Sequence, residues 1–256
     1  MTLNPRIREW SGRRVWIVGA STGIGAALAT RLASLGAQVA VSARQAERLE
    51  ALSLNTRRIR PLPLDVTEPG ALARACERLR DDWGGIDLVV LNAGFYEPLR
   101  SWELTPERVR RTLDVNLLAV YDGVCAVLPT LQACQGGLVL TGSVAGYGGL
   151  PRAGVYGPGK AALINLAEVL YLDMAPRGVG VWIVNPGFVH TPLTEQNEFH
   201  MPALISAEEA ARHIVAGLAS GAFEIHFPRR FTWVLKLLRG LPYRWYFPLI
   251  RRVTGA

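Results

Sequence analysis

The sequence predicts an α/β fold in which a single doubly wound parallel sheet carries helices on both faces. Short apolar segments rich in valine, isoleucine and leucine alternate with helical patterns along most of the chain. A chain of 256 residues, 50% of them hydrophobic, can bury a large core as one domain. The turns after the apolar segments contain glycine, aspartate, asparagine or serine. Because ligands bind at the carboxyl ends of parallel strands, these turns predict a binding site at one edge of the sheet.

The first unit contains a glycine-rich turn. Residues 13–20 have the pattern of a buried strand, and residues 26–37 have that of a helix. Glycines between them would let the backbone turn tightly and approach a phosphate, which the free N–H groups of the helix start would bind. A plain strand-to-helix turn is the alternative. The expected phosphate-binding residues are Gly19, Ser21, Thr22, Gly23, Ile24 and Gly25.

The second strand, residues 38–44, ends at Arg44 with no acidic residue beside it. In dinucleotide-binding folds an acidic residue near this position binds the ribose 2′-hydroxyl, whereas an arginine accommodates a 2′-phosphate. Arg44 therefore favours NADP(H) over NAD(H). The alternative is an ordinary surface arginine, because the chain is rich in arginine.

The following elements continue the alternation. A helix at residues 45–54 and a strand at 57–64 lead to Asp65 and Val66. A helix at 69–82 precedes a strong apolar strand within residues 84–94, which ends in Asn92, Ala93 and Gly94. We expect these five residues to join the cofactor site at the carboxyl edge of the sheet.

The second half of the sheet brings further polar residues to that edge. A long helix starts at Thr105 with Pro106 in its first turn, and it contains Asn116 within an apolar stretch. A polar amide in such a place is usually a satisfied core hydrogen bond. The next strand, within residues 136–143, ends at Ser143. A strand within 178–191, a helix at 206–220 and a last strand at 221–228 complete the pattern.

Tyr156 and Lys160 lie at the start of a long apolar helical pattern. Residues four apart share one helix face, so the phenol and the ammonium can approach one point. A nearby cation lowers the pKa of a tyrosine from its usual value of about 10, which makes the phenol a usable acid and base. The chain has only two lysines, Lys160 and Lys236. An incidental surface lysine at a helix start is the alternative.

Taken together, these motifs resemble those of the classical short-chain dehydrogenases/reductases, over residues 14–227. The likeness rests on GASTGIG from Gly19, Asp65, LNAG at 91–94, Asn116, TGSVAG around Ser143, Tyr156 with Lys160, and PGFVHT ending at Thr191. Two small departures are LNAG where the family has NNAG, and VG where it has TG at the cofactor turn. The resemblance implies a Rossmann-like fold and oxidation or reduction at a carbonyl or alcohol carbon.

The resemblance also implies roles for individual residues. Ser143 would position the substrate carbonyl, Tyr156 would donate the proton, and Lys160 would lower the pKa of Tyr156 and bind the nicotinamide ribose. Asn116 would hold a water that links Lys160 to solvent. The nicotinamide would lie near Pro186, Gly187, Val189 and Thr191, with Tyr156 and Lys160 also contacting the cofactor. We expect the substrate pocket within residues 95–103, 150–152 and 191–202, with residues 192–202 as a mobile lid.

The C-terminal segment differs from the rest of the chain. We divide the sequence into a catalytic domain, residues 1–228, and an amphipathic extension, residues 229–256. The net charge of +7 is confined to residues 225–256, which contain seven basic residues and no acidic one. This segment, rich in tryptophan and tyrosine, predicts either a subunit contact or an anchor on an anionic membrane surface, and hence a hydrophobic or lipid-like substrate.

Composition excludes several other classes. Three cysteines without a CxxC motif, and histidines without ligand spacing, predict no disulfide framework and no metal site. Because the basicity is local, we expect no nucleic acid partner. No apolar run reaches the length of a membrane span. We expect a cytoplasmic protein, with the inner face of the membrane as the alternative location. The resemblance implies a homodimer or homotetramer. A non-catalytic NADP-binding sensor is the alternative function, and the chain length argues against a sugar-nucleotide epimerase or dehydratase.

Overall fold

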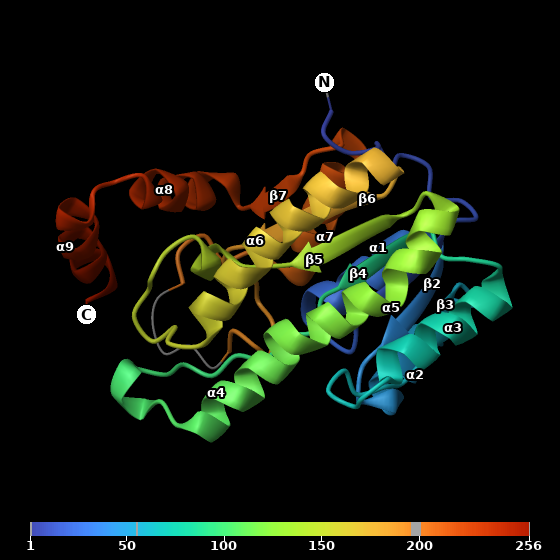
Figure 1. The fold of residues 1–256 in the computed structure, drawn as a ribbon, viewed down its shortest axis with the longest axis horizontal. Helices are drawn as coiled ribbons and strands as arrows, with labels where there is room; N and C mark the ends of the chain where they lie inside the picture. Colours follow the sequence, from blue (N-terminus) through green and yellow to red (C-terminus); the bar gives the residue numbers. More distant parts are fainter. Residues whose placement is uncertain (1, 55, 196–200, 256) are drawn as a thin grey trace.

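The computed structural model describes residues 2–54, 56–195 and 201–255, and seven parallel strands form its sheet (Figure 1). The strand order is β3-β2-β1-β4-β5-β6-β7, so the chain reverses its direction of winding between β1 and β4. The strands are β1 (Arg14–Val18), β2 (Gln38–Ser42), β3 (Ile59–Pro61), β4 (Leu88–Leu91), β5 (Gly137–Thr141), β6 (Gly180–Pro186) and β7 (Glu224–Phe227). This is the doubly wound, Rossmann-like sheet that the sequence predicts.

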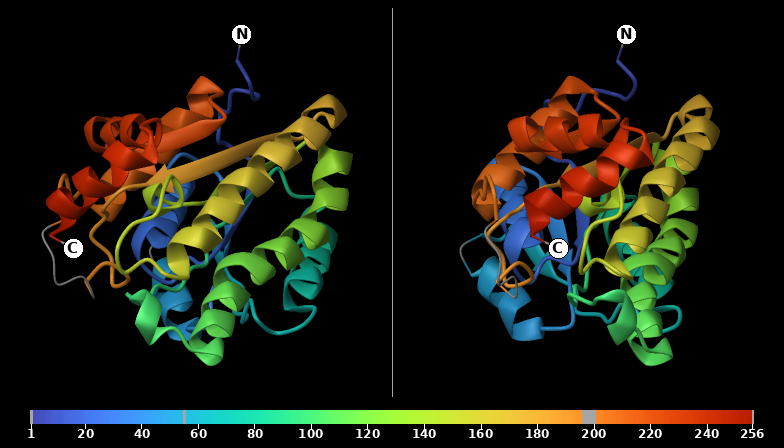
Figure 2. Two further views of the ribbon diagram at one scale, coloured as in Figure 1. Left: turned by 60° about the vertical axis from the view of Figure 1, so that its left-hand side comes forward. Right: turned by 90° about the vertical axis from the view of Figure 1, so that its left-hand side faces the viewer.

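Helices cover both faces of the sheet (Figures 1 and 2). One face carries α1 (Gly23–Ser34), α2 (Ala46–Ser53) and α7 (Ala207–Ser220). The other carries α3 (Ala71–Trp83), α5 (Ala119–Cys134) and α6 (Tyr156–Met174), with α4 (Pro106–Leu113) leading into α5. Short helical turns are η1 (Ser101–Glu103), η2 (Asp114–Leu118), η3 (Val144–Gly146) and η4 (Ala175–Arg177).

Alternate residues of each strand feed two separate cores. Val15 and Ile17 of β1 pack with α1 and α7, whereas Trp16 and Val18 pack with α3, α5 and α6. All four side chains are at most 1% exposed. Because successive side chains of a strand point to opposite faces, a strand buried on both faces must be apolar throughout, as β1 is. The two cores hold the sheet rigid, so its carboxyl edge is a fixed frame for the turns that follow the strands.

Local sequence explains where the elements differ from expectation. The predicted third strand spans residues 57–64, but β3 covers only three residues, and it contains Pro61, which cannot donate to the sheet. The long helix starts at Pro106 with Thr105 as its cap, as predicted, and the Oγ1 of Thr105 accepts from the Arg108 N–H at 3.4 Å. It is interrupted by η2, a π-helical turn that sequence patterns did not indicate.

Together α4, η2 and α5 form one helical segment, Pro106–Cys134. It is the one helix of the described residues that is long and apolar enough, by length and composition alone, to cross a membrane. The expectation of no such segment rested on the lengths of uninterrupted apolar runs. Val120, Val124, Val127 and Leu131 of this helix pack in the core below the sheet. We therefore interpret the segment as a core helix.

Two further helices follow the sheet, α8 (Arg229–Arg239) and α9 (Tyr243–Thr254). They are separated at Gly240 and Pro242, as the sequence predicts. Both lie beyond the end of β7, beside the loop that connects β5 to α6 (Figures 1 and 2). The C-terminal extension is thus placed at the same edge of the sheet as the predicted binding site.

Candidate active site

The glycine-rich turn between β1 and α1 is too crowded for larger residues. Gly19 has a φ of +89°, and a Cβ there would lie 2.4 Å from the backbone nitrogen of Ala93. A Cβ on Gly25 would lie 2.1 Å from the carbonyl oxygen of Gly19. Gly23 also has a positive φ of +58°. The turn therefore needs glycine to bring its backbone close to the β4 loop and to leave the start of α1 open.

Asn92 ties three strand ends together. Its Nδ2 donates to the Gly19 carbonyl at 2.7 Å, and its Oδ1 accepts from the Thr141 hydroxyl at 3.2 Å. These contacts join the ends of β1, β4 and β5, which are neighbours in the sheet. Asn92 was predicted as a cofactor residue, and in the structure it also fixes the shape of the glycine turn. Thr141 was missed because a threonine in a strand carries no distinctive motif.

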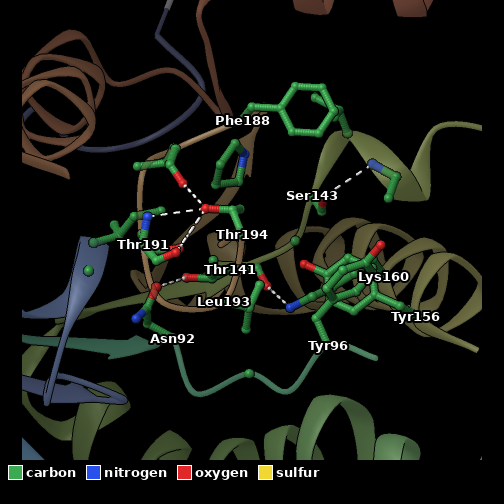
Figure 3. Close-up of a pocket in the computed structure, with 18 of the residues that line it drawn as sticks. Asn92, Tyr96, Thr141, Ser143, Tyr156, Lys160, Phe188, Thr191, Leu193 and Thr194 are labelled. Atoms are coloured by element: carbon green, nitrogen blue, oxygen red, sulfur yellow. Dashed lines mark hydrogen bonds between the residues drawn. The ribbon is translucent and has the colours of Figure 1, made fainter. Parts of the chain in front are cut away.

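A pocket of about 300 Å³ opens at this edge of the sheet (Figure 3). Most of the predicted site residues line it: Gly19, Ser21, Thr22, Gly23, Ile24, Asn92, Ala93, Gly94, Ser143, Tyr156, Lys160, Pro186, Gly187, Val189 and Thr191. Each of the three segments expected to form the substrate pocket contributes described residues, among them Tyr96, Leu150 and Leu193. The glycine motif, the NAG turn and the Ser-Tyr-Lys set thus share one cavity.

Ser143, Tyr156 and Lys160 lie on one side of this pocket (Figure 3). Ser143 directly precedes η3, and its Oγ accepts from the Ala145 N–H at 3.1 Å, which fixes the side chain at the turn. Tyr156 is the first residue of α6. Its ring contacts that of Tyr96 edge-on, with centroids 5.0 Å apart. Lys160, one helical turn later and only 3% exposed, donates from Nζ to the Thr141 carbonyl at 2.7 Å.

The pKa of Tyr156 departs from expectation. Lys160 was expected to lower it, but burial raises it to about 12, with the Ser143 hydroxyl acting in the opposite direction. The Lys160 ammonium is bonded to a backbone carbonyl, and its Nζ lies 5.6 Å from the centroid of the Tyr156 ring. Burial also lowers the pKa of Lys160 itself to about 8. In this arrangement the loss of water on burial is the largest effect on the pKa of both groups.

Asn116 does not reach the pocket. It is fully buried in η2, where its Nδ2 donates to the Phe95 carbonyl at 2.6 Å and its Oδ1 accepts from the Phe95 N–H at 2.8 Å. Both ends of the amide are therefore occupied by one backbone residue. This confirms the expectation of a satisfied core hydrogen bond. The implied water-holding role is not visible in the side-chain contacts, which instead fix the loop that carries Tyr96.

Arg44, Asp65 and Val66 lie outside the pocket, at the ends of β2 and β3. Arg44 is exposed. Asp65 accepts from the Thr67 N–H at 2.9 Å, and this bond, with a smaller effect from Arg44, lowers the pKa of the carboxyl. Val66 packs against the core below the sheet. Gly25 lies beneath the glycine turn rather than in the cavity. Of these predicted cofactor residues, Arg44 is thus open to solvent, whereas Asp65 and Val66 are half-buried.

The segment after β6 forms the opposite wall of the pocket. Thr194 caps the turn that begins at Thr191, donating from its hydroxyl to the Val189 carbonyl at 2.6 Å and accepting from the Thr191 N–H at 3.1 Å (Figure 3). Phe188 and Leu193 add apolar surface. The predicted lid, residues 192–202, lies partly outside the described residues, so only its first turn and its end are placed.

These residues fit a dinucleotide. The glycine turn forms a tight cradle, in which a Cβ on Gly19, Gly23 or Gly25 would collide with Ala93, Thr191 or the Gly19 carbonyl. No side chain of the described residues caps the start of α1, so its first N–H groups are available to a phosphate. The pocket then runs from this cradle to Tyr156 and Lys160. Among the described residues no group of three histidine, cysteine, aspartate or glutamate side chains is placed to hold a metal ion.

A family model described as short chain dehydrogenase matches residues 13–201. The chain belongs to the short-chain dehydrogenase family. An uncharacterized oxidoreductase from Myxococcus xanthus is 34% identical, over 91% of this chain and 94% of that protein. The 3-oxoacyl-(acyl-carrier-protein) reductase of Escherichia coli is 32% identical, over 85% of this chain and 88% of that protein.

Solved structures agree with this assignment. A short-chain dehydrogenase from Burkholderia cenocepacia in complex with NADP superposes with a TM-score of 0.81 at 27% identity, covering 91% of this chain and 95% of that one. A Burkholderia phymatum member in complex with NAD, 23% identical, has the same fold at a TM-score of 0.83 over 90% and 94% of the two chains. The family is one of oxidoreductases that act on small molecules with a nicotinamide cofactor, and relatives with either form occur.

Proposed function

We propose that this short-chain dehydrogenase is an NADP(H)-dependent enzyme that interconverts a carbonyl and an alcohol. The observation that carries the proposal is the single pocket in which Ser143, Tyr156 and Lys160 face the glycine turn. The cofactor would lie along Gly19–Gly25 and reach Pro186–Thr191, where it supplies the hydride. Arg44, exposed at the end of β2, is the group that favours a 2′-phosphate.

The side chains divide the remaining work. The Ser143 hydroxyl donates to the carbonyl oxygen and holds the substrate in place. Tyr156, whose pKa of about 12 keeps it protonated at neutral pH, gives its proton to the oxygen as negative charge develops there. Lys160 stays close to the phenol and holds the nicotinamide end of the cofactor. A protonated phenol suits the reducing direction, which an NADPH preference also favours.

The chemistry of the pocket wall supports a hydrophobic substrate. Leu150, Phe188 and Leu193 line the same cavity as Ser143 and Tyr156. No carboxylate, arginine or histidine lines this pocket among the described residues. A long-chain ketone or aldehyde would bury its chain against these apolar residues. The one charged side chain in the lining among the described residues is Lys160, whose ammonium already donates to the Thr141 carbonyl.

Binding of both cofactors, followed by assays, tests the function. NADPH is expected to bind more tightly than NADH, with turnover of ketones and aldehydes rising with chain length. Arg44→Ala should reduce that preference. The matched control is Arg48→Ala, which replaces an exposed arginine of α2 four residues later. Tight binding of NADPH without turnover of any carbonyl would instead support the non-catalytic sensor. Absence of binding by either cofactor would refute both.

We also propose that the protein forms a homodimer or homotetramer. Four large apolar residues are between 45% and 71% exposed at the end of η2 and on α5 and α6: Leu118, Tyr121, Val169 and Leu172. Large apolar residues gathered on two neighbouring helices suit a symmetric contact with a second copy. For the location in the cell we propose the cytoplasm.

A further inference from the structure

The C-terminal helices expose an unusual amount of apolar surface. Of the eighteen large hydrophobic side chains that are exposed in the described residues, nine lie after residue 228. We call these nine residues the tail surface: Trp233, Val234, Leu237, Leu241, Tyr243, Trp245, Phe247, Leu249 and Val253. Single exposed apolar residues are ordinary, but a dense group of them marks a surface that contacts something else.

The orientation of α8 is well defined. On its inner side Thr232 is fully buried and its Oγ1 lies 2.6 Å from Nδ1 of His226 in β7. Lys236, on the same side, forms an ion pair with Glu224 of β7. Leu237 is 71% exposed, and Trp233, four residues earlier, is 54% exposed although its ring contacts that of His226 in β7 edge-on, with centroids 5.5 Å apart. The exposed apolar side chains are therefore not loosely packed core residues, because other side chains already fill the contact with the body.

Helix α9 likewise has one side packed against the body and the other side exposed to solvent. Tyr246 and Ile250 face the body and are each 6% exposed. Tyr243 and Phe247 stack on each other with centroids 5.3 Å apart and remain 60% and 52% exposed. Pro242 directly precedes α9, and Pro248 lies within it. The stacked rings of Tyr243 and Phe247 thus face solvent, on a helix that Tyr246 and Ile250 hold against the body.

The charge around the tail surface has one sign. No acidic residue follows Glu224 in the sequence. Lys236 is directed toward Glu224, but the other basic residues of the two helices are exposed: Arg229, Arg230, Arg239, Arg244, Arg251 and Arg252. Amphipathic helices with tryptophan, tyrosine and leucine beside a purely basic set bind anionic bilayers, where the rings lie at the level of the lipid headgroups.

The tail helices also touch both walls of the active-site pocket. The Tyr246 hydroxyl donates to the Gly149 carbonyl at 2.9 Å, and Val144 and Leu150 line both the pocket and a small hollow beneath α9. On the other wall, the rings of Phe231 and Phe188 pack with centroids 5.5 Å apart. The loop between β5 and α6 thus has the substrate pocket on one side and the tail on the other.

We propose that the tail surface docks on an anionic lipid bilayer and holds the mouth of the pocket against it. The charge complementarity and the exposed aromatic residues carry the docking, which is independent of the reaction. We add that a substrate dissolved in the membrane enters the pocket from this side, and this second step rests on the proposed function. A second copy of this chain is the competing occupant. Such a contact would bring the six exposed arginines of one copy against those of the other, and these charges repel each other. Anionic lipid would attract the same arginines.

Flotation of the full chain with vesicles tests the docking. Vesicles of phosphatidylcholine alone are compared with vesicles that also contain phosphatidylglycerol, and the protein is expected to float only with the second kind. The variant W233S/L237S should lower the partition coefficient about tenfold or more, because two inserted side chains are lost. Its matched control, W102S/L54S, replaces the same residue types at positions that are 77% and 83% exposed, and it should leave partition unchanged.

A second pair of variants tests the charge. R251E/R252E should also lower partition by about tenfold or more, because each basic residue near an anionic surface contributes several-fold. R57E/R177E makes the same charge change at exposed positions elsewhere and should have little effect. Binding of NADPH to every variant checks folding.

The outcomes separate the two proposals. Equal flotation with neutral and anionic vesicles, or equal loss in a variant and its control, overturns docking. Docking is also overturned if the parent chain does not bind vesicles and light scattering shows that W233S/L237S forms a smaller oligomer than the parent. The tail surface would then be a subunit contact. Vesicle binding without any carbonyl reduction refutes only the proposed function.

Discussion

Burial changes the pKa values of Tyr156 and Lys160 in opposite directions, and both changes favour the neutral form. The phenol stays protonated with a pKa of about 12, and the ammonium becomes easier to deprotonate, with a pKa of about 8. A proton donor with a high pKa is a weak acid in the resting pocket. It becomes effective when negative charge develops on the substrate oxygen beside it, because that oxygen is then the stronger base.

Phenylalanine at position 156 tests this assignment. Tyr156→Phe removes the proton donor while keeping the ring against Tyr96. Turnover should fall about 10²- to 10⁴-fold, the usual contribution of a positioned acid. NADPH affinity should change much less, which a fluorescence titration would show. Tyr171→Phe, which removes a hydroxyl from the same helix outside the pocket, is the matched control and should retain most activity. Retained turnover in Tyr156→Phe would remove Tyr156 from the reaction.

The lysine makes a prediction about stability. Between its folded pKa of about 8 and its ordinary value of 10.5, Lys160 is protonated in the unfolded chain and losing its proton in the folded one. The unfolded state then binds more protons, so the free energy of unfolding rises with pH. Relative to Lys160→Met, the parent chain should gain about 1 kcal/mol per pH unit over this window. Urea unfolding of both chains at several pH values measures the difference in their free energies of unfolding. A difference that does not change with pH would contradict the lowered pKa of Lys160.

At the scale of elements, the glycine turn shows how one local geometry serves several strands. Gly25 lies in the first turn of α1, close to the Gly19 carbonyl oxygen that accepts the hydrogen bond from Asn92. A side chain at Gly25 would push against backbone, which cannot move without displacing the ends of β1 and β4. The turn, the NAG segment and Thr141 therefore form one unit.

Gly25→Ala should disturb this unit. The added methyl group would lie 2.1 Å from the Gly19 oxygen, so we expect a loss of about 1–3 kcal/mol in the free energy of unfolding and weaker cofactor binding. Gly12→Ala is a control for glycine replacement alone, since nothing lies within 4 Å of a Cβ there, although its φ is positive. Thermal unfolding and NADPH titration report the two effects. Unchanged affinity in Gly25→Ala would mean that the cradle tolerates a side chain.

The ion pair between α8 and β7 gives a second prediction at this scale. Burial raises the pKa of Glu224, and hydrogen bonds from Lys236, Tyr147 and Asn185 outweigh it, so the pKa is lowered. Lys236→Met should therefore lower the free energy of unfolding by about 1–3 kcal/mol near neutral pH. The deficit should shrink as the pH falls below the ordinary value of 4.5, where Glu224 gains a proton. A deficit independent of pH would indicate lost packing alone.

Sequence patterns predicted the elements better than their irregularities. Apolar runs predicted all seven strands, and cap residues such as Thr105 and Ser206 predicted helix starts, because both signals are local. The π-helical turn around Asn116 depends on a contact with Phe95, twenty-one residues away, which periodicity does not record. For the same reason the motifs indicated which residues share the pocket but not that Thr141 would occupy the Lys160 ammonium.

At the scale of the whole molecule, sheet topology gathers the site and the extension at one edge. The turns after β1, β4, β5 and β6 supply the pocket, and the chain after β7 continues into α8 on the same side. The opposite edge is closed by the N-terminal segment, where Asn4 donates to the Val181 carbonyl at 2.7 Å. The reversal of strand order between β1 and β4 places the glycine turn beside the NAG turn.

Oligomerisation gives a prediction at this scale. Leu172→Asp places a charge on α6 where a large apolar residue is 71% exposed. If α5 and α6 meet a second copy, this change should dissociate the assembly, as light scattering would show. Leu54→Asp, at a residue 83% exposed on the other face of the sheet, should leave the mass unchanged. An unaltered mass for Leu172→Asp would place the subunit contact elsewhere.

The close approach of α9 to the active-site loop has a consequence for how related sequences diverge. A Cβ on Gly148 would lie 2.6 Å from the Tyr246 hydroxyl oxygen, although Gly148 has an ordinary φ that other residues could adopt. The two positions therefore constrain each other across almost a hundred residues. Among relatives, a side chain at position 148 should occur together with a smaller residue at 246, or with no helix there at all. Such covariation would record, in sequence alone, which members of the family have their C-terminal helices folded against the catalytic loop.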